Sequence, residues 1–408
     1  MRAEGCSDVG RVRGHNEDYW LADDELRLYV VCDGMGGHAA GEVASRTAAE
    51  TLVEGLSADR PTTVEEGRAR LEAAVHEANR RVYAMGAADK AKAGMGTTCT
   101  AVLFVDDRAV LAHVGDSRLY MVRDGEIHQL SSDHTFVAEA VKQGIMTPEQ
   151  AKRSEHTNVV TRAVGPSPQV LVDTLVFDVL PGDTLLLCSD GLTEYLEDHE
   201  LRDRLAASGS AAPGLVAVAN ERGGEDNITV LVVSVDEVDE ARATQVQADL
   251  MALRHIQLLS ELDMAEQAKV VGHLESLYRE QGQAILDQGA EGQGLYILVA
   301  GEVEVVRDGK VIATLPAGSH FGEMALLNQR PRNATARAMT DCRLLHLSRD
   351  GFYQLVQHDH VIGIKFLWRL AQTLSMRLDE AYETPQESEA TRKTMRFGLF
   401  PSPFAPKR

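Results

Sequence analysis

Four aspartates in the first 230 positions stand beside glycine or a small polar residue: Asp33 in CDGMGG, Asp116 in VGDSR, Asp190 in CSDGL and Asp226 in GGEDNIT. Each is predicted to follow, or to end, an apolar run with the character of a β-strand. Any one of these aspartates alone is equally typical of a turn. Together they predict carboxylates converging at strand ends, and hard oxygen ligands select Mg²⁺ or Mn²⁺ rather than zinc.

Such a site is suited to the chemistry of a phosphate monoester, whose own charge repels nucleophiles. Two cations about 3.5–4 Å apart can share a water, lower its pKa and screen the developing charge. Asp33 is the best candidate to bridge both ions, because Gly34 lets a backbone carbonyl approach a metal. Arg13 is predicted to hold the phosphate, since its planar guanidinium matches two phosphate oxygens.

The elements that must position these residues follow from hydrophobic periodicity. Helices are predicted at 42–56, 64–85 and 211–222, and a polar helical insert at 133–157. Strands are predicted at 26–32, 97–105, 108–114, 118–123, 170–177, 183–188 and 227–235. Runs of strands between helices predict a layered α+β domain rather than alternating βαβ units.

Six segments over roughly residues 5 to 235 resemble, in order, the PPM family of metal-dependent protein serine/threonine phosphatases (type 2C). They are RGHNED (13–18), DGMGGHAAGEVAS (33–45), GMGTT (94–98), VGDSRLY (114–120), SDGL (189–192) and GGEDNIT (223–229). The resemblance implies an α-β-β-α sandwich. It also implies hydrolysis of phosphoserine and phosphothreonine in proteins by a metal-bridged water.

The resemblance assigns metal ligands as well. It implies that Asp190 and Asp226 complete the shell of one ion beside the bridging Asp33. The carbonyl of Gly34 and water, with Glu17 as a further candidate, would complete the other.

Further roles follow from the same resemblance. Asp18 would hold metal-bound waters, and Asp116, with Asp190, resembles the ligands of a third, weaker ion. His38 is either the general acid or a residue that structures its loop, because an extra glycine leaves its alignment open. His113, His134 and His156 are weaker candidates for the acid. The insert at 131–164 occupies the place of the family's mobile flap, which can set substrate preference.

Composition shifts at about residue 236, where a second part of the chain begins. A charged stretch without glycine or proline predicts a connecting helix over 237–259, and Asp263 is predicted to cap a helix over 266–279. From residue 283, short glycine-punctuated strands predict a jelly roll or barrel, closed by a helix over 361–382. The basic tail, 385–408, is expected to be flexible, with docking through its aromatic residues as the alternative.

Residues 321–338, FGEMALLNQRPRNATARA, resemble the phosphate-binding cassette of cyclic nucleotide-binding domains. Glu323 is suited to accept a hydrogen bond from a ribose hydroxyl, and Arg332 is suited to neutralise the charge of the phosphate. Asn333 leaves the choice between cAMP and cGMP open, with cAMP favoured by frequency alone. The residues expected in the pocket are Gly322, Glu323, Met324, Ala325, Arg332, Asn333 and Thr335. The alternative is a cupin-like or regulatory domain that has lost its ligand.

Bulk properties narrow the class of protein. The 408 residues carry a net charge of −21 with a pI near 5.1, which argues against nucleic-acid and anionic-membrane partners. No apolar run approaches the ~18 residues of a membrane span, and the N-terminus lacks the apolar core of a signal peptide. Five scattered cysteines suit a reducing compartment, so a cytoplasmic location is expected.

The sequence thus predicts a phosphatase domain (1–236), a connecting helix (237–259), a cyclic nucleotide-binding domain (260–384) and a tail (385–408). Mn²⁺ or Mg²⁺ is the expected cofactor, cyclic nucleotide the expected regulator, and phosphoproteins, with a serine/threonine kinase, the expected partners. One alternative is a nucleotide-dependent scaffold with an inactive phosphatase-like domain. Another is a partner-switching phosphatase acting on anti-anti-sigma-type phosphoproteins. The sign of regulation and the oligomeric state stay open.

Overall fold

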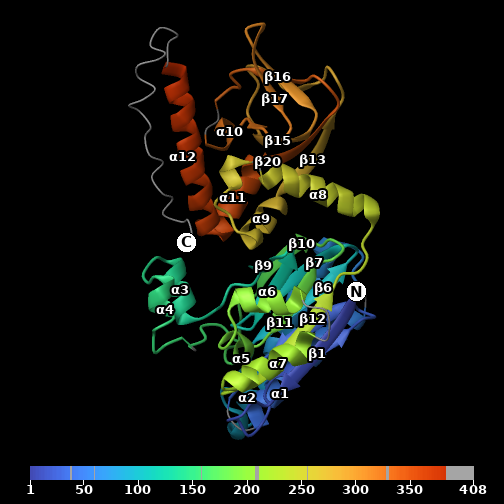
Figure 1. Cartoon of the computed structure of the whole chain (residues 1–408), viewed down its shortest axis with the longest axis vertical. Coiled ribbons are helices and arrows are strands. Elements are labelled where there is room, and N and C mark those ends of the chain that lie inside the picture. Colours follow the sequence, from blue (N-terminus) through green and yellow to red (C-terminus); the bar gives the residue numbers. More distant parts are fainter. Residues whose placement is uncertain are drawn as a thin grey trace. The chain divides into compact units, whose positions relative to one another are not determined.

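The chain folds into two compact units, Met1–Ala243 and Thr244–Arg408, which we describe separately. The computed structural model describes residues 1–36, 39–58, 60–157, 159–206, 211–254, 256–327 and 330–382. The division falls inside helix α8 (Glu240–Arg254), which begins in the first unit and ends in the second (Figure 1). The predicted tail, 385–408, lies outside the described residues.

Two five-stranded antiparallel sheets form the centre of the first unit. One has the order β1 (Arg2–Asp8), β12 (Ile228–Ser234), β11 (Thr184–Cys188), β8 (Arg118–Arg123) and β9 (Glu126–Gln129). The other has the order β10 (Asp173–Asp178), β7 (Arg108–Val114), β6 (Cys99–Val105), β3 (Leu28–Cys32) and β2 (Tyr19–Asp23). A short pair, β4 (Gly34–Met35) and β5 (Gly96–Thr97), continues beyond β3.

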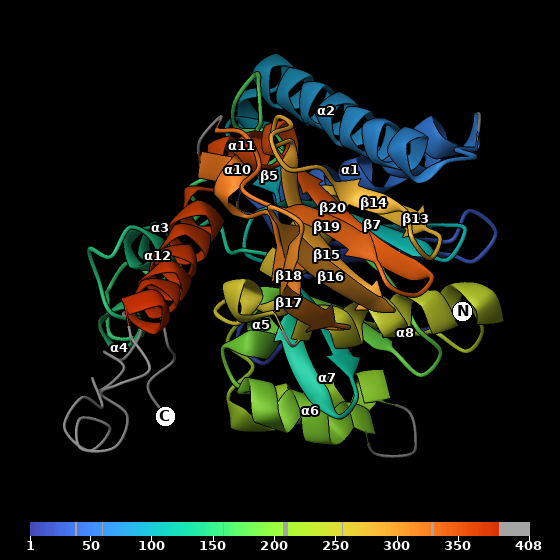
Figure 2. The ribbon, with the colours of Figure 1, turned by 90° about the horizontal axis from the view of Figure 1, so that it is seen from above.

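Helices cover the outer face of each sheet. The long helices α1 (Ala39–Ser57) and α2 (Val64–Ala88) pack side by side on the β3–β6–β7 sheet, burying Leu52 and Leu71 (Figure 2). On the other sheet, α6 (Asp198–Ala206) and α7 (Ala211–Arg222) bury Leu201 and Leu215.

The inner faces of the two sheets are buried as well. In β3, Leu28, Val30 and Cys32 join the helix-side core, so by strand alternation Tyr29 and Val31, both fully buried, point toward the second sheet. Strands β3 and β12 contact one another. The unit is therefore an α-β-β-α sandwich, which confirms the predicted fold.

Between β9 and β10 the chain forms the insert that the sequence places at the flap. It holds two short helices, α3 (Phe136–Lys142) and α4 (Pro148–Ala151). Thr135 caps α3 and Thr147 caps α4 through their side-chain oxygens. A further short helix, α5 (Asp190–Thr193), follows β11 directly.

The second unit is a β-roll of two four-stranded antiparallel sheets. One is ordered β13 (Leu274–Arg279), β20 (Cys342–Ser348), β15 (Gly294–Ala300) and β18 (His320–Phe321). The other is ordered β14 (Ala284–Leu286), β19 (Thr335–Ala338), β16 (Glu302–Arg307) and β17 (Lys310–Pro316). Side chains from both sheets, including Leu298, Val303 and Leu344, fill the roll.

Helices pack against the outside of this roll. They are α9 (Met264–Val271), the cassette helix α10 (Met324–Leu327), α11 (Arg349–His358) and α12 (His360–Tyr382). Phe352 and Phe366 lie buried among Leu295, Ile297 and Leu347 of the sheet. The structure therefore contains the predicted jelly roll and its closing helix.

One predicted helix is wrong in its second half. Asp263 caps α9 with a full capping box, as expected, but the helix ends at Gly272. The segment that follows pairs with β20 along its whole length as β13. Pairing across a sheet, which local sequence does not reveal, overrides the helical pattern there. No helix among the described residues is long and apolar enough to span a membrane.

Candidate functional sites

The sandwich brings the predicted carboxylates together at one end of its strands. Asp33 follows β3, Asp116 follows β7 and Asp190 opens α5 directly after β11. Asp226 differs from the prediction, because it precedes β12 instead of following a strand. In an antiparallel sheet, the start of one strand lies beside the end of its neighbour, so Asp226 still reaches the same edge as Asp190.

The carboxylates are close enough to perturb one another. Burial raises the pKa of Asp33 well above its usual range, and the charges of Asp18, Asp190, Asp116 and Asp226 raise it further. Burial and the charge of Asp190 likewise raise the pKa of Asp116 to about 7. Negative charge at this density is unfavourable unless cations or protons balance it.

The residues present fit hard divalent cations. Glu17 Oε1, Asp18 Oδ1 and Asp190 Oδ1 are buried without a hydrogen-bond partner in the described part of the chain. All three are carboxylate oxygens, the donors that Mg²⁺ and Mn²⁺ prefer. Among the described residues, no three His, Cys, Asp or Glu side chains gather tightly enough to hold an ion by themselves. Mg²⁺ usually keeps several waters, so two carboxylates with a carbonyl and waters suffice.

Backbone crowding explains the glycine that follows Asp33. A Cβ on Gly34 would lie 2.3 Å from the carbonyl oxygen of Gly41 and 2.4 Å from that of Glu17. On the same side, a Cβ on Gly41 would lie 2.6 Å from Glu17 Oε1. Only glycine therefore lets the Asp33 loop, α1 and the Glu17 carboxylate approach this closely.

Two polar side chains that the sequence analysis missed fix the loops around the carboxylates. Asn227 accepts from the Glu17 amide at 2.7 Å and donates to the carbonyls of Val9 and His15, both at 3.0 Å. Ser189 donates to Asp18 Oδ2 at 2.7 Å. Ser189 precedes Asp190 in SDGL, and Asn227 follows Asp226 in EDNIT. This adjacency to predicted metal ligands was the sequence signal by which both residues could have been found.

Arg13, which is predicted to hold the phosphate, lies beside the cluster. Its Nη2 donates to Asp226 Oδ2 at 2.7 Å, and about half of its side chain is exposed. The exposed part of the guanidinium can meet a phosphate that approaches the carboxylates from solvent.

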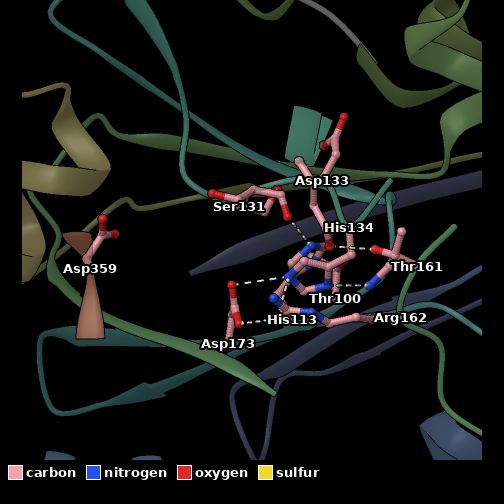
Figure 3. A network of polar contacts seen from close by, with 12 residues as sticks. Thr100, His113, Ser131, Asp133, His134, Thr161, Arg162, Asp173 and Asp359 are labelled. Atoms are coloured by element: carbon pink, nitrogen blue, oxygen red, sulfur yellow. Dashed lines mark hydrogen bonds and ion pairs between the residues drawn. The ribbon is translucent and has the colours of Figure 1, made fainter. Parts of the chain in front are cut away.

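Of the candidate histidines that the structure describes, His113 and His134 are buried, whereas His156 is exposed. His38 lies outside the described residues, so its role as general acid stays a prediction. His113 and His134 are buried, with ring centroids 4.9 Å apart, and both bond within the protein (Figure 3). His156 packs edge-on against Phe136 in the flap. Burial and internal hydrogen bonds argue against proton transfer from His113 and His134 to a leaving group, whereas the role of His156 stays a prediction.

The second predicted site is the cassette in the roll. Gly322 adopts a φ of 83° and Glu323 is buried just before α10. Ala325 is buried in α10, whereas Met324 is exposed. Thr335 opens β19 and accepts from the Gln288 amide at 3.0 Å.

Arg332 reaches the predicted position inside the cassette. It donates from Nη1 to the Gly322 carbonyl and from Nη2 to the Gly294 carbonyl, both at 2.9 Å. Its Nε is buried without a hydrogen-bond partner among the described residues, and its guanidinium lies 5.9 Å from the Tyr296 ring centroid. Neighbouring Asn333 is exposed. A half-buried guanidinium whose hydrogen bonds within the described residues go only to carbonyls is suited to an anionic ligand.

Arg349 is a cassette residue that the sequence analysis missed. Its Nε donates to the Ala325 carbonyl at 2.7 Å and its Nη2 to the Gly292 carbonyl at 3.0 Å. It thus joins α10 to the loop before β15. An arginine at the start of α11 carries no local signal of this role.

Comparisons with known proteins find a family match for each of the two units. Residues 11–224 match the protein phosphatase 2C family, and residues 277–359 match the cyclic nucleotide-binding domain. The serine/threonine phosphatase stp of Listeria welshimeri is 37% identical over 249 residues, which cover 59% of this chain and 99% of that protein.

Solved structures give the same result. The Mycobacterium tuberculosis serine/threonine phosphatase PstP/Ppp is 38% identical with a TM-score of 0.53, covering 58% of this chain and 99% of that one. The PstP catalytic domain in complex with two manganese ions is also 38% identical, with a TM-score of 0.53, and covers 58% of this chain and 98% of that one.

Proposed function

The chain belongs to the protein phosphatase 2C family and is a serine/threonine phosphatase, and we propose that Asp33, Asp190 and Asp226 hold its two divalent cations. When bound, the cations supply an activated water and neutralise charge on the phosphate. The observation that carries the proposal is the set of buried carboxylate oxygens without partners, which includes Asp190 Oδ1.

The chain's own residues orient and bind. Asp18 is held by the Ser189 hydroxyl, and its second oxygen is buried without a partner among the described residues, which suits it to fix waters. Arg13 meets the phosphate oxygens from the exposed side. Asn227 and Gly34 keep the backbone segments in register so that these groups converge. Phosphoproteins are the proposed substrates, and the flap between β9 and β10 is the proposed source of preference among them.

The test compares two carboxylate-to-amide changes. Asp190→Asn is expected to abolish Mn²⁺-dependent turnover of p-nitrophenyl phosphate and of a phosphothreonine peptide while the protein stays folded. Asp203→Asn, at an exposed carboxylate paired with Arg202, serves as the control and is expected to behave as wild type. Turnover that persists in Asp190→Asn, or that needs no divalent cation, would refute the assignment.

We also propose that the β-roll binds a cyclic nucleotide and that binding alters phosphatase activity. The half-buried Arg332 guanidinium, which bonds the carbonyls of Gly322 and Gly294 and leaves Nε without a partner among the described residues, supports the binding of one phosphate charge. Coupling between two sites in one protein is typically about 1–3 kcal/mol, or roughly 5–150-fold in affinity.

Calorimetric titration with cAMP and with cGMP tests binding, and peptide hydrolysis with and without saturating ligand tests coupling. Arg332→Ala is expected to lose binding and any ligand effect while keeping the activity measured without ligand. Arg307→Ala, at an exposed arginine of β16, is the matched control. Wild-type protein that binds neither nucleotide would refute binding, and binding without any change in kinetics would refute regulation alone.

A further inference from the structure

His134 makes two hydrogen bonds to a single residue, Gly115. The Gly115 N–H donates to His134 Nδ1 at 3.0 Å, and the His134 N–H donates back to the Gly115 carbonyl at 2.8 Å. Gly115 immediately precedes Asp116, and His134 lies at the start of the flap. This pair of bonds therefore fixes the backbone that carries one of the proposed metal ligands.

The bond from Gly115 determines the protonation of the His134 ring. Because a backbone N–H can only donate, Nδ1 must be an unprotonated acceptor. The neutral ring then carries its proton on Nε2, which donates to Asp173 Oδ2 at 3.1 Å (Figure 3). The Arg162 guanidinium, 3.3 Å from Nε2, cannot donate to a nitrogen that is already protonated, and it bonds Asp173 Oδ1 at 2.8 Å instead.

The other constraints on this loop leave Asp116 little freedom. Gly115 has a φ of 112°, and a Cβ there would lie 2.5 Å from the Thr98 side chain. On the far side of Asp116, the Ser117 hydroxyl bonds Thr98 Oγ1 at 2.7 Å. Thr98 Oγ1 in turn accepts from the Asp33 amide at 2.8 Å. Asp116 thus stands between two residues that are both held, one by the flap and one by the Asp33 loop.

We propose that His134 is a positioning residue for Asp116. The ring, neutral and protonated on Nε2, holds Gly115 and so directs the Asp116 carboxylate toward Asp190 and the cations. His134 itself is 3% exposed with both nitrogens engaged, so it has no part in proton transfer to substrate. The inference rests on the proposed role of Asp116 as a metal ligand.

Two substitutions separate the two ring nitrogens. In His134→Asn the amide oxygen takes the place of Nδ1 and can still accept from Gly115, whereas the contact with Asp173 is lost. In His134→Gln the amide nitrogen takes the place of Nε2 and can still donate to Asp173, whereas the acceptor for Gly115 is lost. Both remove the imidazole, so packing alone does not distinguish them.

The first readout is Mn²⁺ binding to the full chain, followed by the electron paramagnetic resonance signal of free Mn²⁺. His134→Gln is expected to weaken the weakest Mn²⁺ site by about tenfold, the equivalent of one lost hydrogen bond, while His134→Asn binds nearly as wild type. The Mn²⁺ concentration for half-maximal hydrolysis of a phosphothreonine peptide is expected to shift in parallel.

Asp116→Asn distinguishes failure of this inference from failure of its premise. An unchanged Mn²⁺ isotherm in Asp116→Asn would overturn the ligand role of Asp116 and the role of His134 with it. Two other outcomes would overturn the role of His134 alone. In one, Mn²⁺ binding is weakened in Asp116→Asn but not in His134→Gln. In the other, His134→Gln and His134→Asn weaken Mn²⁺ binding equally. The nitrogen chemical shifts of the wild-type ring give a test without substitution, because a proton on Nδ1 contradicts the proposal.

Discussion

Arg13 illustrates how one side chain can serve two partners in turn. Its Nη2 donates to Asp226, while half of the side chain remains in solvent, within reach of an arriving phosphate. We expect Arg13→Ala to raise KM for a phosphothreonine peptide by about tenfold, the value of one charge-assisted bond. Arg13→Lys keeps the charge but lacks the planar guanidinium, so its KM should lie between those of the wild type and of Arg13→Ala.

Steady-state kinetics of the Arg13 variants would measure this. Arg11→Ala, which removes an exposed arginine two positions away, is the control and should leave KM unchanged. A fall in kcat with KM unaltered would show that Arg13 acts on the transition state alone.

His113 makes stability depend on pH. Burial lowers its pKa to about 4, and in the unfolded chain an ordinary histidine has a pKa of about 6.5. Between these values the unfolded state binds more protons, so this contribution is complete above pH 6.5 and is lost as pH falls toward 4. A shift of this size is on the order of 3 kcal/mol.

The matching experiment follows urea unfolding of the phosphatase unit at pH 7 and pH 5 in the wild type and in His113→Gln. The variant cannot titrate at this position, so its loss of stability between the two pH values should be smaller. An equal loss would show that other groups cause the acid sensitivity.

At the scale of elements, a buried ion pair joins β8 to the turn before β11. Arg123 donates from Nε to Asp183 Oδ1 at 2.9 Å and from Nη2 to Oδ2 at 2.5 Å. The side chains are 5% and 2% exposed, so removing one charge leaves the other uncompensated. We expect Asp183→Asn to reduce the free energy of unfolding by about 3–5 kcal/mol.

Chemical denaturation measures this loss, and a second arginine–carboxylate pair supplies the control. Glu200 and Arg222, between α6 and α7, are considerably more exposed, and Glu200→Gln should change stability little. Comparable losses in the two variants would contradict the dependence on burial.

Elements were predictable from sequence where the signal is local, and not elsewhere. The apolar stripe of α2 and the caps of α9 are local features, and both helices begin where the sequence indicates. Strand β1 is polar and only half-buried, so nothing in its residues distinguishes it from a loop. Its identity comes from pairing with β12, which lies more than 200 residues away.

The same distinction holds for the sites. Aspartates with glycine neighbours predict the proposed metal ligands because the chemistry needs those residue types. Asn227 and Ser189 stand next to predicted ligands in the sequence, but their bonding partners, like those of His134, are distant in sequence and only the fold reveals them.

At the scale of the whole molecule, the phosphatase unit is expected to work without the β-roll. The Listeria welshimeri phosphatase matches this chain over 99% of its own length, and that match involves only 59% of this chain. Residues 1–243 should therefore fold and hydrolyse p-nitrophenyl phosphate with Mn²⁺, with no response to cAMP or cGMP. Lack of turnover by this fragment, with full turnover by the intact chain, would show that the second unit is needed for catalysis.

The bonds that Arg332 makes to Gly322 and Gly294 affect the rate at which a bound ligand would dissociate. These bonds use two of the five guanidinium N–H groups, and Nε has no hydrogen-bond partner among the described residues, so a phosphate can bind an arginine that the two carbonyls already hold in place. Affinity differences between related complexes are expressed mainly in dissociation rates. The proposed cyclic nucleotide should therefore dissociate more slowly from this pocket than from one whose arginine must first be ordered.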